Sequence, residues 1–484
     1  MDTSQQSIEN IKRIPLVAVL LTGAFLAILN QTLLTTALPH FMRDFDITAN
    51  TGQWLTTIFM LVNGVMIPIT AFLIEKFTTR KLFLVAMGLF ALGTLVCALA
   101  PTFSFLMVGR VLQAAGAGIM MPLMQTVLLL VFPIEKRGAA MGMVGLVISF
   151  APALGPTLSG WIVENYHWSV LFWVVFPVAI IDMIAAYFIL KNVTTLRNPK
   201  VDILSIVLSS LGFGGLLFGF SNAGEHSWIS YMVILPTAIG VVTLIWFIRR
   251  QLRLEQPILE FRVFRYGVFT LTTVIGMVVF IALIGGATIL PIYMQDMHHF
   301  TALETGLMIL PGAVLMGLMS PITGRIFDKI GARTLTIIGL TLITVTTFMF
   351  TNLTPTTSFT YITVVNAVRM LGVSMVMMPV TTAGINVLPR VLIPHGTAMN
   401  NTMRQVSGSI GTAVLVTVMT TTALDPQATG DIDLALVHGV NMSFIVAGAL
   451  SLAGLILALF IKKKEAPEDD TDERKEQGKA VTEG

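Results

Sequence analysis

The sequence has little charge and almost no cysteine. Only 11% of its 484 residues are charged, whereas a soluble domain carries about a quarter. Hydrophobic residues make up 55%, and the mean hydropathy is +0.84. This composition excludes a water-soluble enzyme. The single cysteine, Cys97, excludes a disulfide framework and any cysteine-based zinc or iron–sulfur site.

Several functional motifs are also missing from the sequence. It contains no GxxxxGK[ST] phosphate loop, so ATP is not the energy source within this chain. It has no TVGYG-type filter or acidic ring typical of channels, and no clustered metal ligands or nucleophile–base pair. We therefore expect no enzyme activity, no cofactor and no metal site. The net charge of +3 does not indicate nucleic-acid binding, because the basic residues lie between apolar stretches.

What the sequence does contain is a series of fourteen apolar stretches. Most reach the roughly 20 residues that cross a bilayer, and a backbone in lipid must satisfy its own hydrogen bonds, which favours helices. The weakest stretches are 202–221 and 229–248, which are glycine-rich and joined by a polar link. We predict an all-α membrane protein with 14 transmembrane helices.

The distribution of basic residues tests this count. With the N-terminus placed in the cytoplasm, 22 of the 29 lysines and arginines fall in inner segments and one, Arg43, falls outside. Positive charge is enriched in cytoplasmic loops, and the omission of one helix would reverse every later loop. We therefore expect an even number of spans and two cytoplasmic termini.

The two halves of the chain resemble each other. An acid at a helix end followed by bases occurs at Glu75 and again at Asp328, and an arginine followed by Met-Met-Pro occurs at Arg110 and at Arg369. Such repeats around a central site are usual in secondary transporters. The repeat predicts a 6+2+6 arrangement with these ranges: 1–13 cytoplasmic N-terminus, 14–191 first six-helix bundle, 192–262 two inserted helices and linker, 263–461 second six-helix bundle, and 462–484 disordered charged cytoplasmic tail.

Several motifs along the chain, taken in order, carry a family resemblance. They are Leu29 to Pro39, in which Asn30 stands where an aspartate is usual; Ala71 to Arg80; Gly324, Asp328, Lys329, Gly331 and Arg333; Arg110, Gln113 and Gly116; Gly142, Ala151, Gly155, Pro156 and Gly160; and Asn400 to Gly411. The sequence resembles the major facilitator superfamily. Within it, the sequence is similar to the fourteen-helix drug:proton antiporters of the EmrB/QacA group, closest to lincomycin-resistance-type exporters.

Three arginines lie within apolar stretches, where lipid exposure would cost about 2.5–3.5 kcal/mol each. We expect Arg110, Arg369 and Arg404 to face the interior. Arg110 would either shift the proton affinity of a neighbouring acid or form a structural tie, and the polar face around Arg404 would either contact substrate or join helices. The predicted cavity residues are Asn30, Gln31, Gln113, Arg369, Asn400, Asn401, Arg404 and Gln405.

One acid, Asp182, lies deep in an apolar run. A carboxyl in such surroundings is able to bind and release a proton near neutral pH. Asp182, together with Arg110, is therefore our candidate for proton coupling. The alternative is that Asp182 caps a helix or pairs with a loop base such as Lys191. Since Asn30 cannot titrate, the coupling acid must lie elsewhere than in the first span.

The remaining candidates concern conformational change. We predict a latch between the two halves, for which the alternative is ordinary loop solvation; its residues are Glu75, Lys76, Arg80, Asp328, Lys329 and Arg333. A carboxylate is stabilised by about 0.3–1 kcal/mol near a helix N-terminus. The resemblance implies an antiporter motif in the fifth span, comprising Gly142, Ala151, Gly155, Pro156 and Gly160, which would form a hinge or simply pack small residues closely.

Together these features predict a monomeric, multi-pass protein of the bacterial cytoplasmic membrane. The resemblance implies a secondary multidrug efflux transporter that exchanges amphipathic toxic compounds for protons by alternating access. The alternatives are a transport-deficient membrane sensor or interaction protein of the same fold, and a metabolite exporter or uniporter. The expected partners are small-molecule drugs, protons and membrane lipid, with no nucleic acid.

Overall fold

The computed structural model describes residues 13–194, 196–197, 201–223, 227–424 and 432–461, and within these ranges it contains helices and no strand. The predicted all-α class is therefore confirmed. The α-helices are α2 (Arg13–Phe45), α3 (Ala49–Lys76), α4 (Thr79–Ala98), α5 (Phe103–Val131), α6 (Arg137–Asn165), α7 (Val170–Ile189), α8 (Ile203–Ala223), α9 (Tyr231–Gln251), α10 (Gly267–Ile292), α11 (Ala302–Ile330), α12 (Ala332–Met349), α13 (Phe359–Asn386), α14 (Ile393–Thr421) and α16 (Ile432–Ala458). The predicted disordered tail, 462–484, and residues 1–12 of the predicted N-terminal segment lie outside the described residues.

Thirteen helical segments of the described residues are long and apolar enough to cross a membrane. They include α8 and α9, which correspond to the two weakest apolar stretches. The helix α14 does not meet the criterion although it has 29 residues, because it carries Asn400, Asn401, Arg404 and Gln405. The first three of these side chains are buried, so the polarity of α14 faces other helices.

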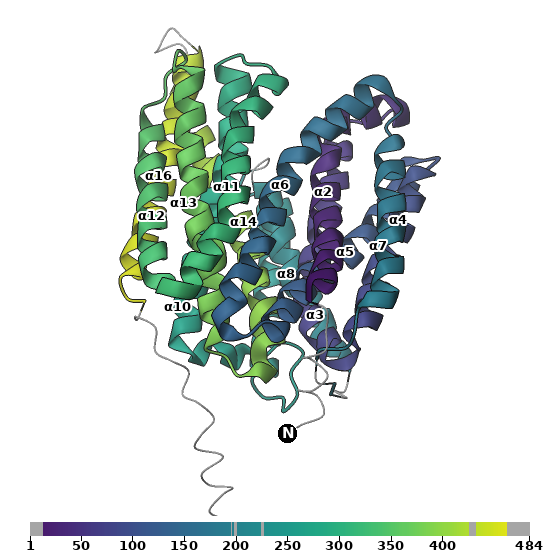
Figure 1. Ribbon diagram of the computed structural model, residues 1–484. Helices are drawn as coiled ribbons and strands as arrows, with labels where there is room; N and C mark the ends of the chain where they lie inside the picture. Colours follow the sequence, from purple (N-terminus) through teal and green to yellow (C-terminus); the bar gives the residue numbers. More distant parts are fainter. Residues whose placement is uncertain (1–12, 195, 198–200, 224–226, 425–431, 462–484) are drawn as a thin grey trace, which may run out of the picture.

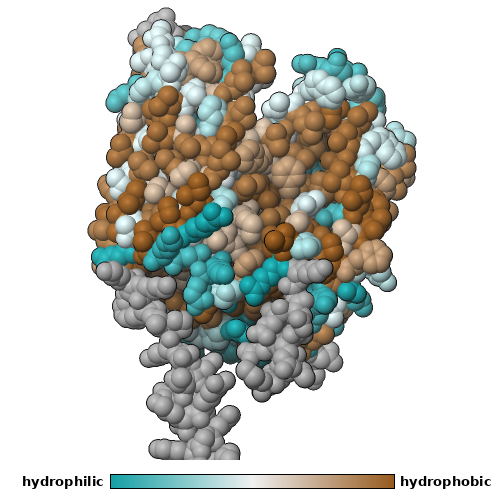
Figure 2. Space-filling view, in the orientation of Figure 1, coloured by the Kyte–Doolittle hydropathy of each residue, from teal (hydrophilic) through white to brown (hydrophobic). Residues whose placement is uncertain are grey.

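The helices form two groups that meet at one end of the molecule and separate at the other (Figure 1). We call α2–α7 the N-terminal group and α10–α14 with α16 the C-terminal group. We call the end where α2 begins and α16 ends the base, and the opposite end the mouth. The groups meet where α6 packs on α11 and α3 packs on α14. Figure 2 shows the molecule hollowed between the groups at the mouth.

On the face that Figure 2 shows, the surface between the two ends is largely apolar, and hydrophilic side chains gather toward the ends. Many helices begin at hydroxyl caps near these ends. Thr78 caps α4, Thr102 caps α5 and Ser358 caps α13, each accepting a backbone N–H of the first turn. Such caps satisfy N–H groups that have no partner within the helix.

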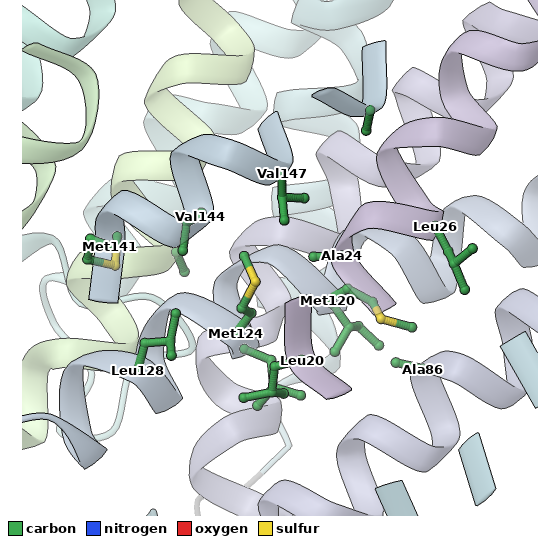
Figure 3. Close-up of a cluster of buried hydrophobic side chains, with 14 of the residues drawn as sticks. Leu20, Ala24, Leu26, Ala86, Met120, Met124, Leu128, Met141, Val144 and Val147 are labelled. Carbon is green, nitrogen blue, oxygen red and sulfur yellow. The ribbon is translucent and has the colours of Figure 1, made fainter. Parts of the chain in front are cut away.

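A closely packed core of large apolar side chains fills the N-terminal group. Met120 and Met124 of α5 lie against Leu20 and Ala24 of α2, near Val144 of α6 (Figure 3). All five are buried. Because α5 is held by this core, it provides a fixed support for the polar side chains described next.

Candidate functional site

At the base, Asp328 joins the end of α11 to the first turn of α6. Its Oδ1 accepts the Gly138 N–H at 2.7 Å and its Oδ2 accepts the Ala139 N–H at 2.9 Å. The first N–H groups of a helix lack partners within it, and the positive end of the helix favours a carboxylate. This predicted latch residue therefore connects the two groups. Lys329 and Arg333, predicted with it, are exposed.

Glu75 occupies the matching position at the end of α3, but its partner is a side chain. Its Oε1 lies 3.2 Å from Nε2 of His395 in the first turn of α14, and both side chains are buried. Of the bases predicted with Glu75, Lys76 is half-buried, and Arg80 donates from Nε to the Leu190 carbonyl at 2.6 Å. Arg80 therefore makes this bond within the N-terminal group.

Two more hydrogen bonds cross between the groups near the base. Arg137 at the start of α6 donates from Nη1 to Oδ1 of Asn386 at 2.9 Å. Asn401 of α14 donates from Nδ2 to Oε1 of Gln125 on α5 at 2.7 Å. Asn401, a predicted cavity residue, thus joins helices in this conformation.

The base is also closed by direct contact of backbones. A Cβ atom added at Gly142 of α6 would lie 2.5 Å from the Ser320 carbonyl oxygen of α11. One added at Gly138 would overlap the carbonyl oxygen of Gly324. The small residues of α6 and α11 therefore allow these helices to approach more closely than larger side chains would permit.

The other residues of the antiporter motif predicted in the fifth span, which is α6, lie toward the mouth and form a different contact. A Cβ atom at Gly155 would overlap the hydroxyl of Thr32 on α2, so α6 packs closely on a helix of its own group there. Ala151 is fully buried and Pro156 is half-buried. Gly160 has open space beside it. The motif is therefore divided between the α11 contact and the α2 contact.

Arg110 is fully buried in α5 and has uncharged partners. It donates from Nη1 to Oδ1 of Asn30 at 2.5 Å and to Oε1 of Gln113 at 3.0 Å, and from Nε to the Leu55 carbonyl at 3.0 Å. Its guanidinium carbon lies 4.3 Å from the ring centroid of Phe59, a cation–π distance. No carboxylate of the described residues forms an ion pair with it.

Arg369 of α13 repeats this arrangement in the C-terminal group. It donates from Nη1 to the Ala282 carbonyl of α10 at 3.1 Å and from Nη2 to Oδ1 of Asn366 at 3.3 Å. Gly286 of α10 leaves the space that its guanidinium fills. Arg110 and Arg369 therefore each bind a carbonyl of a neighbouring helix and a side-chain amide. This similarity supports the predicted repeat.

Arg404 of α14 is bound to α13. Its Nη2 donates to the Met377 carbonyl at 3.0 Å and to Oγ1 of Thr381 at 2.5 Å. The predicted inward orientation of all three arginines is confirmed, since each is at most 4% exposed. Of the remaining cavity candidates, Asn400 is buried with its Oδ1 unpaired, while Gln31 and Gln405 are half-buried.

Asp182 lies on α7 and is buried, with 5% of its surface exposed. Its Oδ2 has no hydrogen-bond partner among the described residues. Lys191, the base that we considered as its alternative partner, is exposed and forms no ion pair within the described ranges. Within the described part of the chain, no hydrogen bond or ion pair joins Asp182 to Arg110, the other coupling candidate.

An ion pair joins the two helices α8 and α9 at the base. The carboxylate of Asp202, just before α8, accepts hydrogen bonds from Nε of Arg250 at 2.8 Å and from Nη2 at 3.1 Å. The hydrogen bonds from Arg250 hold the pKa of the Asp202 carboxyl below its usual range, with a further contribution from Ser205. This pair fixes α9, the least buried of the candidate spans, to its neighbour.

The family comparison agrees with this architecture. The family model described as the Major Facilitator Superfamily matches residues 20–412. The chain belongs to the major facilitator superfamily. It is therefore a multi-pass protein of the cell membrane with many apolar helices, and membership of this family does not imply enzyme activity.

Individual relatives support this assignment. The uncharacterized MFS-type transporter YcnB of Bacillus subtilis is 59% identical, with 95% of this chain and 97% of YcnB covered. The lincomycin resistance protein LmrB of Listeria monocytogenes is 43% identical, with 94% of this chain and 98% of LmrB covered. The predicted resemblance to lincomycin-resistance-type exporters is thus confirmed.

A solved structure confirms the fold at low sequence identity. The human organic anion transporter MFSD10 (TETRAN) superposes with a TM-score of 0.68, covering 92% of this chain and 99% of that chain. The two sequences are 13% identical, so this likeness concerns the fold alone.

Sequence reasoning missed several residues that join the two groups. His395, Gln125, Arg137 and Asn386 each provide one side of a contact at the base. Arg137 and His395 lie in no local motif that marks them as contact residues. Their partners lie between 249 and 320 residues away, and no local pattern reports such distances.

Proposed function

We propose that this protein is a secondary multidrug efflux transporter that exports amphipathic toxic compounds in exchange for protons by alternating access. The observation that carries the proposal is the asymmetry of the two ends: hydrogen bonds and backbone contacts join the groups at the base, and the groups separate at the mouth. The resistance function in the name of the relative LmrB supports export as the direction.

For the topology, we propose fourteen spans in a 6+2+6 order. The span beyond the thirteen apolar segments is α14, whose buried polar residues lower its mean hydropathy below that of the other spans. The six-helix bundles are 14–191 and 263–461, and 192–262 supplies α8, α9 and the linker. The base faces the cytoplasm and both termini lie there. Support comes from the basic residues near this end, such as Lys81 at the start of α4 and Arg333 at the start of α12.

In this topology the structure is open to the outside. Asp328 and Glu75 act as the latch that holds the cytoplasmic side closed, with Arg137 and Asn401 adding cross-group bonds. Opening the base requires these bonds to break together, and closing the mouth requires α6 to move relative to α11 and α2. Gly142 and Gly155, which lie at these two contacts, are the proposed pivots.

For binding and coupling, we propose that the inward polar groups line the substrate path. Asn400 and Asn30 keep unpaired buried polar atoms, which a substrate or water is able to satisfy. Asp182 remains our proton carrier because its buried Oδ2 is unpaired. We expect a monomer in contact with lipid, and substrates that are neutral or weakly charged.

The test is transport in everted membrane vesicles. A growth panel in a strain lacking its own pumps selects a substrate, and uptake of that compound is followed on imposing a proton gradient. We expect uptake that collapses on adding an uncoupler. Uptake indifferent to the uncoupler would contradict antiport, and an unchanged inhibitory concentration for every compound would favour the sensor alternative.

A pair of acid variants tests the carrier in the same vesicles. Asp182→Asn should abolish gradient-driven uptake, while Glu164→Gln, which removes an exposed acid at the mouth end of α6, should leave it intact. Full transport by Asp182→Asn removes this residue from coupling.

A further inference from the structure

The imidazole of His395, carried by α14, contacts two other segments at the base. Its Nε2 lies 3.2 Å from Oε1 of Glu75 at the end of α3. Its Nδ1 accepts the backbone N–H of Glu260 at 3.2 Å, just before the short helix η2 (Phe261–Arg265) that leads into α10. The ring itself is carried by the first turn of α14 and is 4% exposed.

These two partners define the protonation state of the ring. A backbone N–H can only donate, so Nδ1 carries no proton and acts as the acceptor. The carboxylate of Glu75 can only accept, so Nε2 carries the proton. The closed base therefore contains a neutral histidine whose tautomer is fixed by its neighbours, as is common when both ring nitrogens are bonded.

Protonation would change both contacts in opposite directions. The bond to Glu75 would become an ion pair, and a charge-assisted hydrogen bond is roughly twice as strong as a neutral one. The new proton on Nδ1 would face the Glu260 N–H and break that bond. The Glu75 contact crosses between the two groups, whereas the Glu260 contact ties α14 to the linker before α10. The gain therefore acts on the closure of the base.

The charged groups around the ring leave the imidazole of His395 as the side chain that faces the Glu75 carboxylate. The Glu260 carboxylate is occupied by Arg262, whose Nη1 lies 3.2 Å away. Arg197 donates its backbone N–H to the Glu75 carbonyl at 2.9 Å. Among the described residues no lysine or arginine forms an ion pair with the Glu75 carboxylate.

The matching latch in the other half uses backbone donors. Asp328 accepts the backbone N–H groups of Gly138 and Ala139, which do not titrate near neutral pH. The two latches are related by the internal repeat, and the imidazole of His395 distinguishes the Glu75 latch, because imidazole is the side-chain group best suited to act as a switch at physiological pH.

We propose that His395 is a proton-binding site that controls closure of the base: protonation strengthens the bond between Glu75 of α3 and α14 to an ion pair, and deprotonation weakens it to the neutral hydrogen bond. The inference rests on the proposed alternating-access function. In the proposed topology the base faces the cytoplasm, so an alkaline cytoplasm would favour opening toward the side from which the drug is loaded, and acid would hold that side closed.

The experiment measures the separation of the groups at the base against pH in the substrate-free, full-length protein. Spin labels are attached at Lys81→Cys on α4 and Val391→Cys before α14, both exposed, while the buried Cys97 stays unlabelled. Pulsed electron paramagnetic resonance then gives the open and closed populations. We expect the open-to-closed ratio to rise about five-fold or more from pH 5 to 8.

His395→Gln keeps a neutral donor but cannot titrate, so its ratio should be independent of pH; His395→Asn replaces it if that variant does not fold. The matched control is His167→Gln, because His167 also bonds a carboxylate, Asp44, at 3.0 Å but is exposed at the mouth. The open-to-closed ratio of His167→Gln should change with pH as it does in the unmodified protein.

Two results would overturn the proposal: the same pH dependence in His395→Gln as in the unmodified protein, or no pH dependence while Asp328→Asn opens the base. If no condition or variant ever opens the base, the proposed alternating-access function is contradicted. This outcome differs from both results that would overturn the role of His395 alone.

Discussion

Asn30 and Arg110 form a buried pair in which an amide oxygen, 2.5 Å from the guanidinium, takes the place where a carboxylate is usual in the group that the sequence resembles. The buried charge of Arg110 is thus balanced by neutral acceptors and the face of Phe59. A proton cannot bind at this amide–guanidinium pair, so the proton coupling that we propose requires a residue elsewhere in the molecule.

Removal of the Asn30 amide should destabilise the N-terminal group. Asn30→Ala leaves a buried cation short of one acceptor, and hydrogen bonds to charged groups contribute about 2 kcal/mol. We expect a lower thermal unfolding temperature in detergent, and Asn30→Asp should retain stability because it keeps an acceptor. The control is Asn165→Ala at an exposed position; equal losses in the two alanine variants would contradict this assignment.

The Asp328 latch should weaken when its charge is removed. In Asp328→Asn the side chain has one acceptor oxygen and no negative charge, so it cannot bind both N–H groups of α6 as the carboxylate does. The free energy that favours the closed base should fall by about 0.3–1 kcal/mol. The spin-label distance at the base should shift toward longer values. Glu304→Gln is a matched control, because Glu304 also accepts a backbone N–H at a helix start but within its own helix. A shift of equal size in the control would count against the latch.

A methyl group at the α6–α11 contact should block closure of the base. In Gly142→Ala the new Cβ would lie 2.5 Å from the Ser320 carbonyl oxygen, and overpacking of this kind costs about 1–3 kcal/mol. We expect loss of transport with normal membrane expression. Gly306→Ala on α11, where no atom lies within 4 Å of the new Cβ, should transport normally; wild-type transport by Gly142→Ala would show that the backbones need not touch.

The Asp202–Arg250 pair should give an acid-dependent contribution to stability. Because Arg250 lowers the pKa of Asp202, the pair stabilises the fold above the usual aspartate pKa of about 3.9 and loses this effect as the pH falls through the lowered value. Asp202→Asn should therefore lower the unfolding temperature at neutral pH by a small amount, and the difference should vanish in acid. A difference that persists unchanged in acid would refute the pairing.

The sequence was sufficient for the helices and for the burial of the three arginines, because apolar length and the cost of charge in lipid are local properties. It also identified Glu75 and Asp328, since the repeat marks both. It did not identify His395, because nothing in the residues around position 395 shows that α3 ends beside it. It could not show that Asn401 binds Gln125, which depends on how the two groups dock.

The central claim is that the base and the mouth open alternately. The direct measurement records two spin-label distances under the same conditions, one at the base between Lys81→Cys and Val391→Cys and one at the mouth between Tyr166→Cys and Leu303→Cys, all exposed positions. We predict that every condition that lengthens the base distance shortens the mouth distance. Distances that lengthen together, or a base distance that never changes, would contradict the account.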